Sequence, residues 1–267
     1  MADHDGRPVA LITGASGGIG EKLAYEAARS GYTVVLTARS EPELNRVAGV
    51  MTTKLAATTI PIAADLSDPA SIDDLQSELK RRGLQVDVLV NNAGFGMNGA
   101  ATDIDRRQQA NMIDLNVRGL TDMTLRFLPY MQSRDAGGVI NVASLAAFMP
   151  GPYMAVYYAT KAYVLSFSRA LASELEGSGV KVCVACPGVV DTRFQERAKM
   201  QGTMVTKTTP SMSAEEVAEA IWTGFQAKNQ VIVPGISNWM LSKLVKFIPG
   251  GIMMKMIKRL HAPVDGE

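Results

Sequence analysis

The stretch VALITGASGGIG, residues 9–20, decides the fold. Its first five residues are an apolar run of strand type, and an alanine-rich helical pattern follows the last glycine. Gly14, Gly18 and Gly20 allow a sharp turn between them and let a pyrophosphate approach the unpaired amides at the start of the helix. The spacing is G-x-x-x-G-x-G, so a tight turn without a ligand is the alternative. The strand before the turn and the helix after it favour a phosphate-binding unit.

The same alternation of strand and helix continues along the chain. Apolar runs predict strands near 9–13, 33–38, 58–63, 86–91, 138–144, 180–186 and 230–233. Helical patterns fill 71–82, 106–132 and 154–176, and Ser213 with Glu216 forms a capping box that opens another helix. This order predicts an α/β fold, a single-domain, doubly wound, Rossmann-like parallel sheet with helices on both faces. Ligands of such sheets bind beyond the carboxyl ends of the strands.

No Pro/Ser/Gly-rich linker divides the 267 residues. We therefore expect one domain, with a dinucleotide-binding catalytic part over 1–235 and a C-terminal helical extension over 236–267.

A second stretch, YYATK at 157–161, carries chemistry. Helical spacing places Tyr157 and Lys161 on one face, where the ammonium would favour the phenolate and lower the pKa of the tyrosine. Such a phenol can exchange protons with a hydroxyl or carbonyl group. The alternative is an exposed Tyr and Lys that merely share a helix face.

Charge and composition exclude several classes of partner. The chain has 27 basic and 26 acidic residues, so no broad attraction to nucleic acid is expected. The polar, acidic residues 1–5 lack a signal-peptide pattern, which favours a cytoplasmic protein. Cys183 and Cys186 lie in a strand pattern and are interpreted as inert core thiols, and His4 and His261 lie near opposite ends, so no metal site is expected.

Taken together, the motifs resemble the short-chain dehydrogenase/reductase family over about residues 9–192. The resemblance rests on TGASGGIG at 13–20, Asp65-Leu66, NNAG at 91–94, Asn116, Ser144, YYATK at 157–161, and Pro187-Gly188 followed by Thr192. It implies an oxidoreductase that uses a nicotinamide cofactor on a small carbonyl or alcohol substrate, and that forms a homo-oligomer.

The resemblance implies four catalytic residues. Tyr157 would donate a proton to the carbonyl oxygen or accept one from the alcohol, and Ser144 would hydrogen-bond the same oxygen. Lys161 would lower the Tyr157 pKa and hold the nicotinamide ribose, while Asn116 would fix a water linked to Lys161. Ser144 could instead cap a helix or turn, and Asn116 could be a satisfied polar group in a helix. Tyr158 competes for the proton-transfer role, but the family pattern makes it a packing neighbour.

Cofactor preference depends on the end of the second predicted strand. An acid that would bind the ribose 2′-hydroxyl of NAD is replaced there by Ala38, and the following Arg39 suits a 2′-phosphate. NADP(H) is favoured over NAD(H), although Arg39 could be simply solvated and Gly17 supplies no second cation. The expected cofactor contacts are Gly14, Ser16, Gly18, Ile19, Gly20, Arg39, Ser40, Asp65, Leu66, Asn92, Ala93, Gly94, Tyr157, Lys161, Pro187, Gly188 and Thr192.

By resemblance, Asp65 bonds the adenine ring and Leu66 adds a backbone contact. Asp65 could cap the next helix, but Ser67 and Asp68 are better placed to do so. The NNAG turn would line the adenosine side, or only brace the sheet, and the loop 187–192 would face the nicotinamide carboxamide.

The substrate pocket is expected between residues 145–154 and 194–212, with Phe148, Met149, Met200 and Met204 on its walls. These apolar side chains favour a hydrophobic ketone, aldehyde or secondary alcohol, although methionine is often only core filler. Two other functions are considered, a nucleotide-sensing regulator on the same fold and a protein that acts on a membrane surface or a partner through its C-terminus.

The tail carries two apolar helical patterns, 239–248 and 252–260, joined by Pro249-Gly250-Gly251 and bearing five cations and no acid. Its apolar runs are shorter than the ~20 residues that span a bilayer. The helices could pack on the domain or a subunit interface, cover the pocket as a lid, or make peripheral membrane contact over 239–260.

Overall fold

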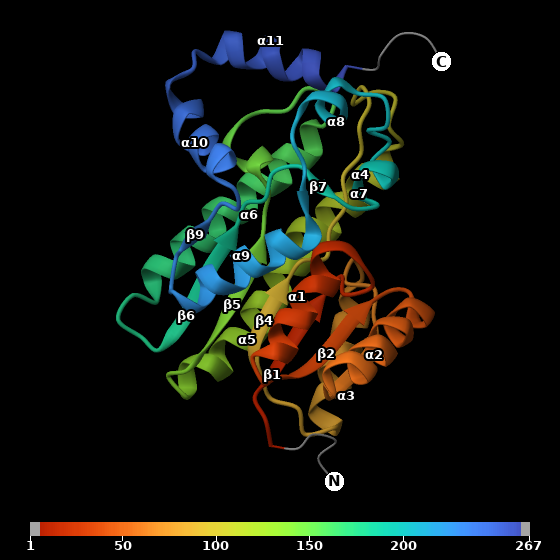
Figure 1. Cartoon of the computed structure of the whole chain (residues 1–267), viewed down its shortest axis with the longest axis vertical. Coiled ribbons are helices and arrows are strands. Elements are labelled where there is room, and N and C mark those ends of the chain that lie inside the picture. The colour runs from red at the N-terminus through yellow and green to blue at the C-terminus, as the bar shows by residue number, and fades with distance from the viewer. Residues whose placement is uncertain (1–5, 263–267) are drawn as a thin grey trace.

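The computed structural model describes residues 6–262, and within them a parallel sheet of seven strands lies at the centre (Figure 1). The strand order is β3-β2-β1-β4-β5-β6-β9, and every neighbouring pair is parallel. The strands are β1 (Val9–Thr13), β2 (Thr33–Ala38), β3 (Thr59–Ala63), β4 (Val86–Asn91), β5 (Gly137–Val142), β6 (Val180–Ala185) and β9 (Val231–Ile232). The predicted doubly wound fold is confirmed.

Helices cover both faces of the sheet (Figure 1). Leu11 packs with the residues of one face and its neighbour Ile12 with those of the other, because successive side chains of a strand point to opposite sides. Both are fully buried, as parallel strands between two helical layers require. One layer consists of α1 (Gly18–Arg29), α2 (Glu41–Leu55) and α9 (Ala214–Gln226), and the other of α3 (Pro69–Arg81), α5 (Leu120–Ser133) and α6 (Ala155–Glu174).

The predicted single helix over 106–132 is divided into three segments. A π-helical segment, η1 (Asp114–Gly119), separates α4 (Arg106–Ile113) from α5. The wider turn brings Gly119 against the Leu66 carbonyl oxygen, which would lie 2.2 Å from a Cβ at that position. It also turns Asn116 inward, where the side chain is fully buried. Single π-turns are frequently found at functional sites.

Smaller differences lie at the ends of elements. The Asp68 side chain accepts a hydrogen bond from the Ala70 amide at 3.1 Å, so α3 begins at Pro69 rather than at residue 71. The capping box of Ser213 and Glu216 is confirmed. Short elements that the sequence pattern did not predict are β7 (Val190–Asp191), β8 (Met212–Ser213), α7 (Phe194–Arg197), α8 (Met204–Thr208) and η2 (Leu145–Phe148).

The tail forms α10 (Ile236–Leu244), the short 3-10 helix η3 (Val245–Phe247) and α11 (Gly250–His261). Met253 and Ile257 of α11 are buried in a cluster that also contains Tyr157. None of the helices in the described residues is both long enough and apolar enough to cross a membrane.

Candidate active site

The glycine turn closes tightly between β1 and α1. Gly14 and Gly18 have φ of +65° and +57°, which favours glycine. A Cβ on Gly20 would lie 2.3 Å from the Gly14 carbonyl oxygen, so only glycine fits there. Gly17, which precedes α1, makes no side-chain cap and leaves the first amides of this 12-residue helix available to an anion. The residues present therefore fit a dinucleotide pyrophosphate.

The end of β4 is fastened to this turn. The amides of Asn92 and Ala93 both donate to Thr13 Oγ1 at 2.9 Å, and Asn92 Nδ2 donates to the Thr13 carbonyl oxygen at 3.0 Å. Asn92 therefore braces the sheet, the structural alternative raised from the sequence. Thr13, the last residue of β1 and the first of TGASGGIG, is not among the predicted site residues.

Asn116 and Lys161 meet at the far side of the NNAG turn. A Cβ on Gly94 would lie 3.0 Å from Asn116 Oδ1 and 3.4 Å from Lys161 Nζ. Asn116 Oδ1 accepts a hydrogen bond from the Phe95 amide, and its Nδ2 donates to the Phe95 carbonyl oxygen and to Thr160 Oγ1. The hydrogen bonds of Asn116 are thus those of the alternative raised from the sequence, a satisfied polar group inside a helix.

Tyr157 lies on α6 beneath an apolar cover. Its ring centroid is 5.5 Å from that of Phe194, and Gly96 leaves the space in which both rings and Met154 approach. Burial raises the pKa of Tyr157 to about 12, and hydrogen bonding with the Ser144 side chain lowers it only partly. The phenol therefore keeps its proton at neutral pH.

The expected lowering of the Tyr157 pKa by Lys161 is not what the structure shows. Lys161 Nζ donates to the Val142 carbonyl oxygen at 2.9 Å and lies 5.8 Å from the centre of the Tyr157 ring. Burial also lowers the pKa of Lys161 to about 8. The two groups do share a helix face, but desolvation outweighs their mutual attraction.

Ser144 follows β5 and performs the capping role that was the alternative to catalysis. Its hydroxyl accepts a hydrogen bond from the Ala146 amide at 3.1 Å at the start of η2 and lies 3.5 Å from the Pro187 carbonyl oxygen. The same side chain lowers the pKa of Tyr157, so the cap also holds Ser144 close to the phenol.

Arg39 and Ser40 are exposed directly after β2. Burial alone would raise the pKa of Asp65, but hydrogen bonds from the hydroxyl and amide of Ser67 and the nearby Arg39 charge lower it overall. Arg39 and Asp65 are therefore neighbours on the strand ends that the sequence placed at the adenosine side. Asp68, not Asp65, caps α3.

The loop 187–194 reaches back over the glycine turn. A Cβ on Gly18 would lie 3.2 Å from Thr192 Cγ2, and one on Gly17 would lie 3.6 Å from Arg193 Nη2. A Cβ on Gly188 would meet Asn238 of α10 at 2.6 Å. Thr192 is thus close to the phosphate-binding turn, whereas Gly188 faces α10, and the sequence pattern missed Arg193.

The predicted pocket walls gather around Tyr157. Phe148 and Met149 before α6, and Met200 after α7, belong to its apolar cluster. Met204, by contrast, is 41% exposed and lies outside the cluster.

Tyr158 faces the tail. Its hydroxyl lies 2.7 Å from Nε2 of His261 in α11, which no local pattern predicted.

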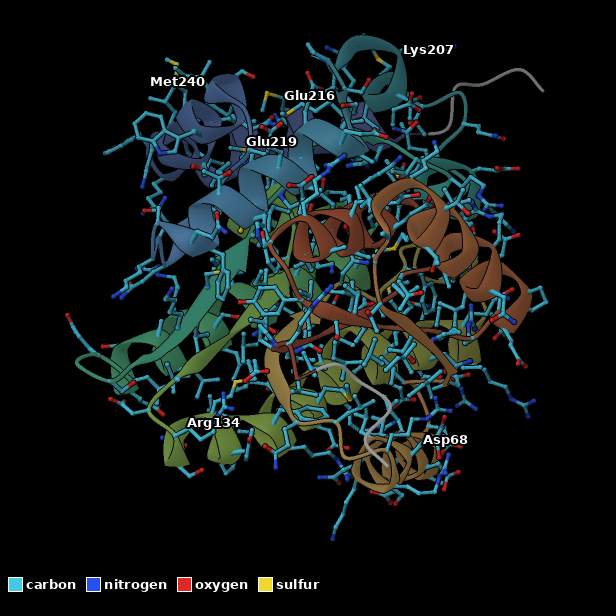
Figure 2. All side chains as sticks on the ribbon, turned by 60° about the horizontal axis from the view of Figure 1, so that its bottom comes forward. Asp68, Arg134, Lys207, Glu216, Glu219 and Met240 are labelled. Carbon is cyan, nitrogen blue, oxygen red and sulfur yellow. The ribbon has the colours of Figure 1, made fainter. Side chains whose placement is uncertain are left out.

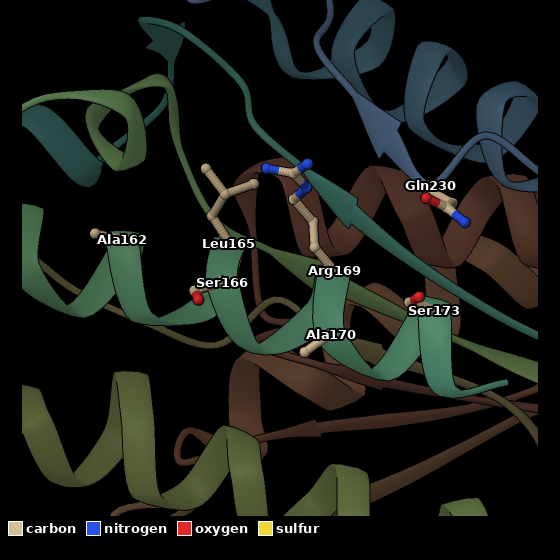
Figure 3. A pocket seen from close by; sticks show the side chains of 7 residues that line it. All are labelled: Ala162, Leu165, Ser166, Arg169, Ala170, Ser173 and Gln230. Carbon is tan, nitrogen blue, oxygen red and sulfur yellow. The ribbon is translucent and has the colours of Figure 1, made fainter.

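A surface hollow on the outside of α6 is separate from this site. Figure 3 shows its lining residues, all on one stripe of α6 except Gln230, which precedes β9. Tyr157 and Lys161 are buried on the other side of the same helix.

Cys183 and Cys186 are free and buried, and burial raises the pKa of both thiols to about 12. Among residues 6–262 no group of three metal-ligating side chains gathers, and His4 lies outside that range.

The family model for short chain dehydrogenase matches residues 8–202. The chain belongs to the short-chain dehydrogenase/reductase family. This dehydrogenase is 33% identical to the very-long-chain 3-oxoacyl-CoA reductase of Anas platyrhynchos over 95% of this chain and 81% of the relative. The solved short-chain dehydrogenase of Sphingobium yanoikuyae in complex with NADPH is 29% identical with a TM-score of 0.80, over 97% and 99% of the two chains. A Burkholderia phymatum structure in complex with NAD has a TM-score of 0.81 at 24% identity, over 98% of each chain, and shares the fold.

This dehydrogenase is therefore an oxidoreductase of a family that binds nicotinamide cofactors and acts on small molecules. Family members are found with both NADPH and NAD.

Proposed function

We propose that this dehydrogenase uses NADP(H) to interconvert the carbonyl group of a hydrophobic aldehyde or ketone and the corresponding alcohol, with Tyr157 as general acid and base. The observation that carries the proposal is the buried Tyr157 phenol, which lies in an apolar cluster and whose pKa the neighbouring Ser144 side chain lowers against the effect of burial. The NNAG turn connects this pair to the phosphate-binding turn, because Asn92 bonds to Gly14 and Gly94 abuts Lys161. One continuous site thus offers a place for a dinucleotide and a proton donor.

Tyr157, Ser144 and Lys161 each have a separate role in the proposed reaction. When bound, the nicotinamide supplies or accepts the hydride. Tyr157 donates its proton to the carbonyl oxygen in reduction, and a pKa of about 12 keeps that proton in place until the oxygen gains negative charge. Ser144 donates a hydrogen bond to the same oxygen. Lys161, with a pKa near 8, carries a positive charge at neutral pH and offsets the charge of the phenolate that remains.

The residues at the end of β2, Ala38 and Arg39, favour NADP(H). Arg39 is exposed beside Asp65 and has a planar guanidinium group that suits a phosphate monoester. Ala38 stands where a carboxylate would otherwise bind the 2′-hydroxyl of NAD. The NADPH complex of the Sphingobium relative supports this preference, and the NAD complex of the Burkholderia structure makes a direct comparison of the two cofactors necessary.

The apolar side chains around Tyr157 favour a hydrophobic substrate. Phe194 and Met154 lie beside the phenol at Gly96, and Met200 belongs to the same apolar cluster. A substrate that replaces some of these contacts would gain about 25 cal/mol for each Å² of apolar surface removed from water. We also propose a homo-oligomer, as is usual in this family.

The test is a screen of aldehydes, ketones and secondary alcohols that follows nicotinamide absorbance with NADPH and NADH in parallel. We expect turnover of apolar carbonyl compounds, faster with NADPH. Tight cofactor binding without turnover of any compound would instead favour the alternative of a nucleotide-sensing regulator on the same fold.

A further inference from the structure

Helix α10 turns its apolar side chains away from the rest of the protein. Ile236, Trp239, Met240, Leu244 and Phe247 are 80%, 51%, 50%, 54% and 83% exposed. Ile236, Met240, Leu244 and Phe247 follow one another at spacings of three or four residues, and Trp239 lies three residues after Ile236, so the five side chains form one stripe along α10 and η3. We call these five side chains the α10 stripe.

The inward face of the same helix is small and partly polar. Ser242 is buried, with its hydroxyl bonded to the Trp239 carbonyl oxygen, and Asn238 Nδ2 donates to the Pro234 carbonyl oxygen at 2.9 Å. A surface helix normally buries its apolar face and exposes its polar face. Here Ser242 of α10 and Val245 of η3 are the buried residues, and Val245 belongs to the cluster of Tyr157. The stripe is therefore not needed to hold α10 in place, and a contiguous exposed apolar patch marks an interaction surface.

Helix α11, at the top of the molecule in Figure 1, extends this surface. Ile252 and Met256 are 60% and 42% exposed, whereas Met253 and Ile257 on the neighbouring face are buried. Figure 2 shows Met240 at the outer edge of the molecule. The exposed apolar residues of both tail helices are therefore accessible from outside, while α11 stays anchored to the core.

The charge of the tail distinguishes between the possible binding partners of the α10 stripe. Residues 236–262 contain Lys243, Lys246, Lys255, Lys258 and Arg259, and no Asp or Glu. A second copy on a twofold axis would bring the same surface, with the same five cations, against itself. An anionic lipid surface instead attracts the cations and accepts apolar side chains at the boundary of headgroups and acyl chains.

We propose that the α10 stripe and these five cations dock on an anionic membrane surface. The contact lies in the plane of the interface, since α10 and α11 are short helices of nine and 12 residues. The proposal rests on α10 and α11 alone and is independent of the catalytic assignment.

The test is co-sedimentation of the full-length protein with vesicles of phosphatidylcholine containing phosphatidylserine, and with vesicles of phosphatidylcholine alone, at low and high salt. Removal of the whole tail is unsuitable because it would take Met253 and Ile257 out of the core. One double variant, Leu244→Ser with Phe247→Ser, removes part of the stripe. A second, Lys243→Glu with Lys246→Glu, reverses two charges.

The matched control is Lys54→Glu with Lys80→Glu, which reverses two exposed charges on α2 and α3. Thermal melting checks that each variant is folded. We expect the wild type and the control to bind the anionic vesicles, more weakly at high salt, and each α10 variant to bind about 10-fold less or weaker still.

Absence of binding by the folded wild type would overturn the proposal, as would α10 variants that bind like the wild type. Light scattering provides a further outcome. If the wild type binds no vesicles and self-associates, and the α10 variants do not self-associate, a second copy occupies the stripe and the proposal fails.

Discussion

Tyr157 and Lys161 illustrate how burial changes the chemistry that a motif predicts. The helical spacing correctly placed the two side chains on one face of α6. It could not reveal that Lys161 Nζ bonds to the Val142 carbonyl oxygen, since β5 lies far away in the sequence. With pKa values of about 12 and about 8, the phenol is an acid that holds its proton until it is needed. This protonation state suits the reduction of a carbonyl group.

The first prediction at this scale concerns Arg39. Replacing it by aspartate, Arg39→Asp, should weaken NADPH by about 10- to 100-fold, because a charge-assisted hydrogen bond contributes about 1.5–3 kcal/mol. Binding of NADH should change little or improve, since the new carboxylate can accept a bond from the ribose hydroxyl. Cofactor titration by nicotinamide fluorescence measures both. The control is Arg107→Asp on α4, which replaces another exposed arginine. An unchanged preference for NADPH over NADH would show that Arg39 is only a solvated surface residue.

At the scale of elements, replacement of two helical glycines by alanine is expected to change the free energy of unfolding in opposite directions. A Cβ at Gly20 would collide with the Gly14 carbonyl oxygen, whereas Gly49 in α2 has nothing within 4 Å of that position. Gly20→Ala should therefore lower the free energy of unfolding by about 1–3 kcal/mol through overpacking. Gly49→Ala should raise it by about 0.5–1 kcal/mol, because alanine is the better helix former. Urea unfolding compares the two, and equal effects would show that Gly20 has no steric role.

The elements themselves could largely be predicted from periodicity, because buried parallel strands and amphipathic helices leave strong patterns. The π-turn at Asp114–Gly119 could not be predicted, because the groups that it contacts lie in other parts of the chain. Gly119 faces the Leu66 carbonyl oxygen, and Asn116 accepts a hydrogen bond from the Phe95 amide. The short β7–β8 pair likewise depends on two loops that meet only in the folded protein. Local sequence specified the capping box of α9 correctly, since all of its partners lie within four residues.

At the scale of the whole molecule, the tail completes the active-site cluster. The sequence predicted two apolar helices there but not their different roles, with α11 packed against the cluster of Tyr157 and α10 largely exposed. The contact between Tyr158 and His261 joins residues 103 positions apart, so no local pattern could indicate it. The domain boundary at residue 235, the homo-oligomer and the cytoplasmic location stay predictions.

The burial of His261 beside Tyr158 leads to a prediction for the stability of the protein. Burial lowers the pKa of His261 from 6.5 to about 4, so the unfolded chain binds a proton more readily than the folded one. The stabilising effect of the neutral ring is present above about pH 6.5 and is lost as the pH falls toward 4. Between about pH 7 and pH 5 the wild type should lose about 2 kcal/mol of unfolding free energy that His261→Gln does not lose. Parallel loss in both proteins would show that other groups cause the acid sensitivity.

The most direct test of the proposed function is the turnover of Tyr157→Phe with NADPH and a carbonyl compound accepted by the wild type. Tyr163→Phe, a more exposed tyrosine on the same helix, is the control. We expect Tyr157→Phe to bind NADPH like the wild type and to lose about 100-fold or more of its turnover, the usual contribution of general acid catalysis, while the control stays active. Turnover of Tyr157→Phe within a few-fold of the wild type would contradict the assignment of Tyr157 as the proton donor.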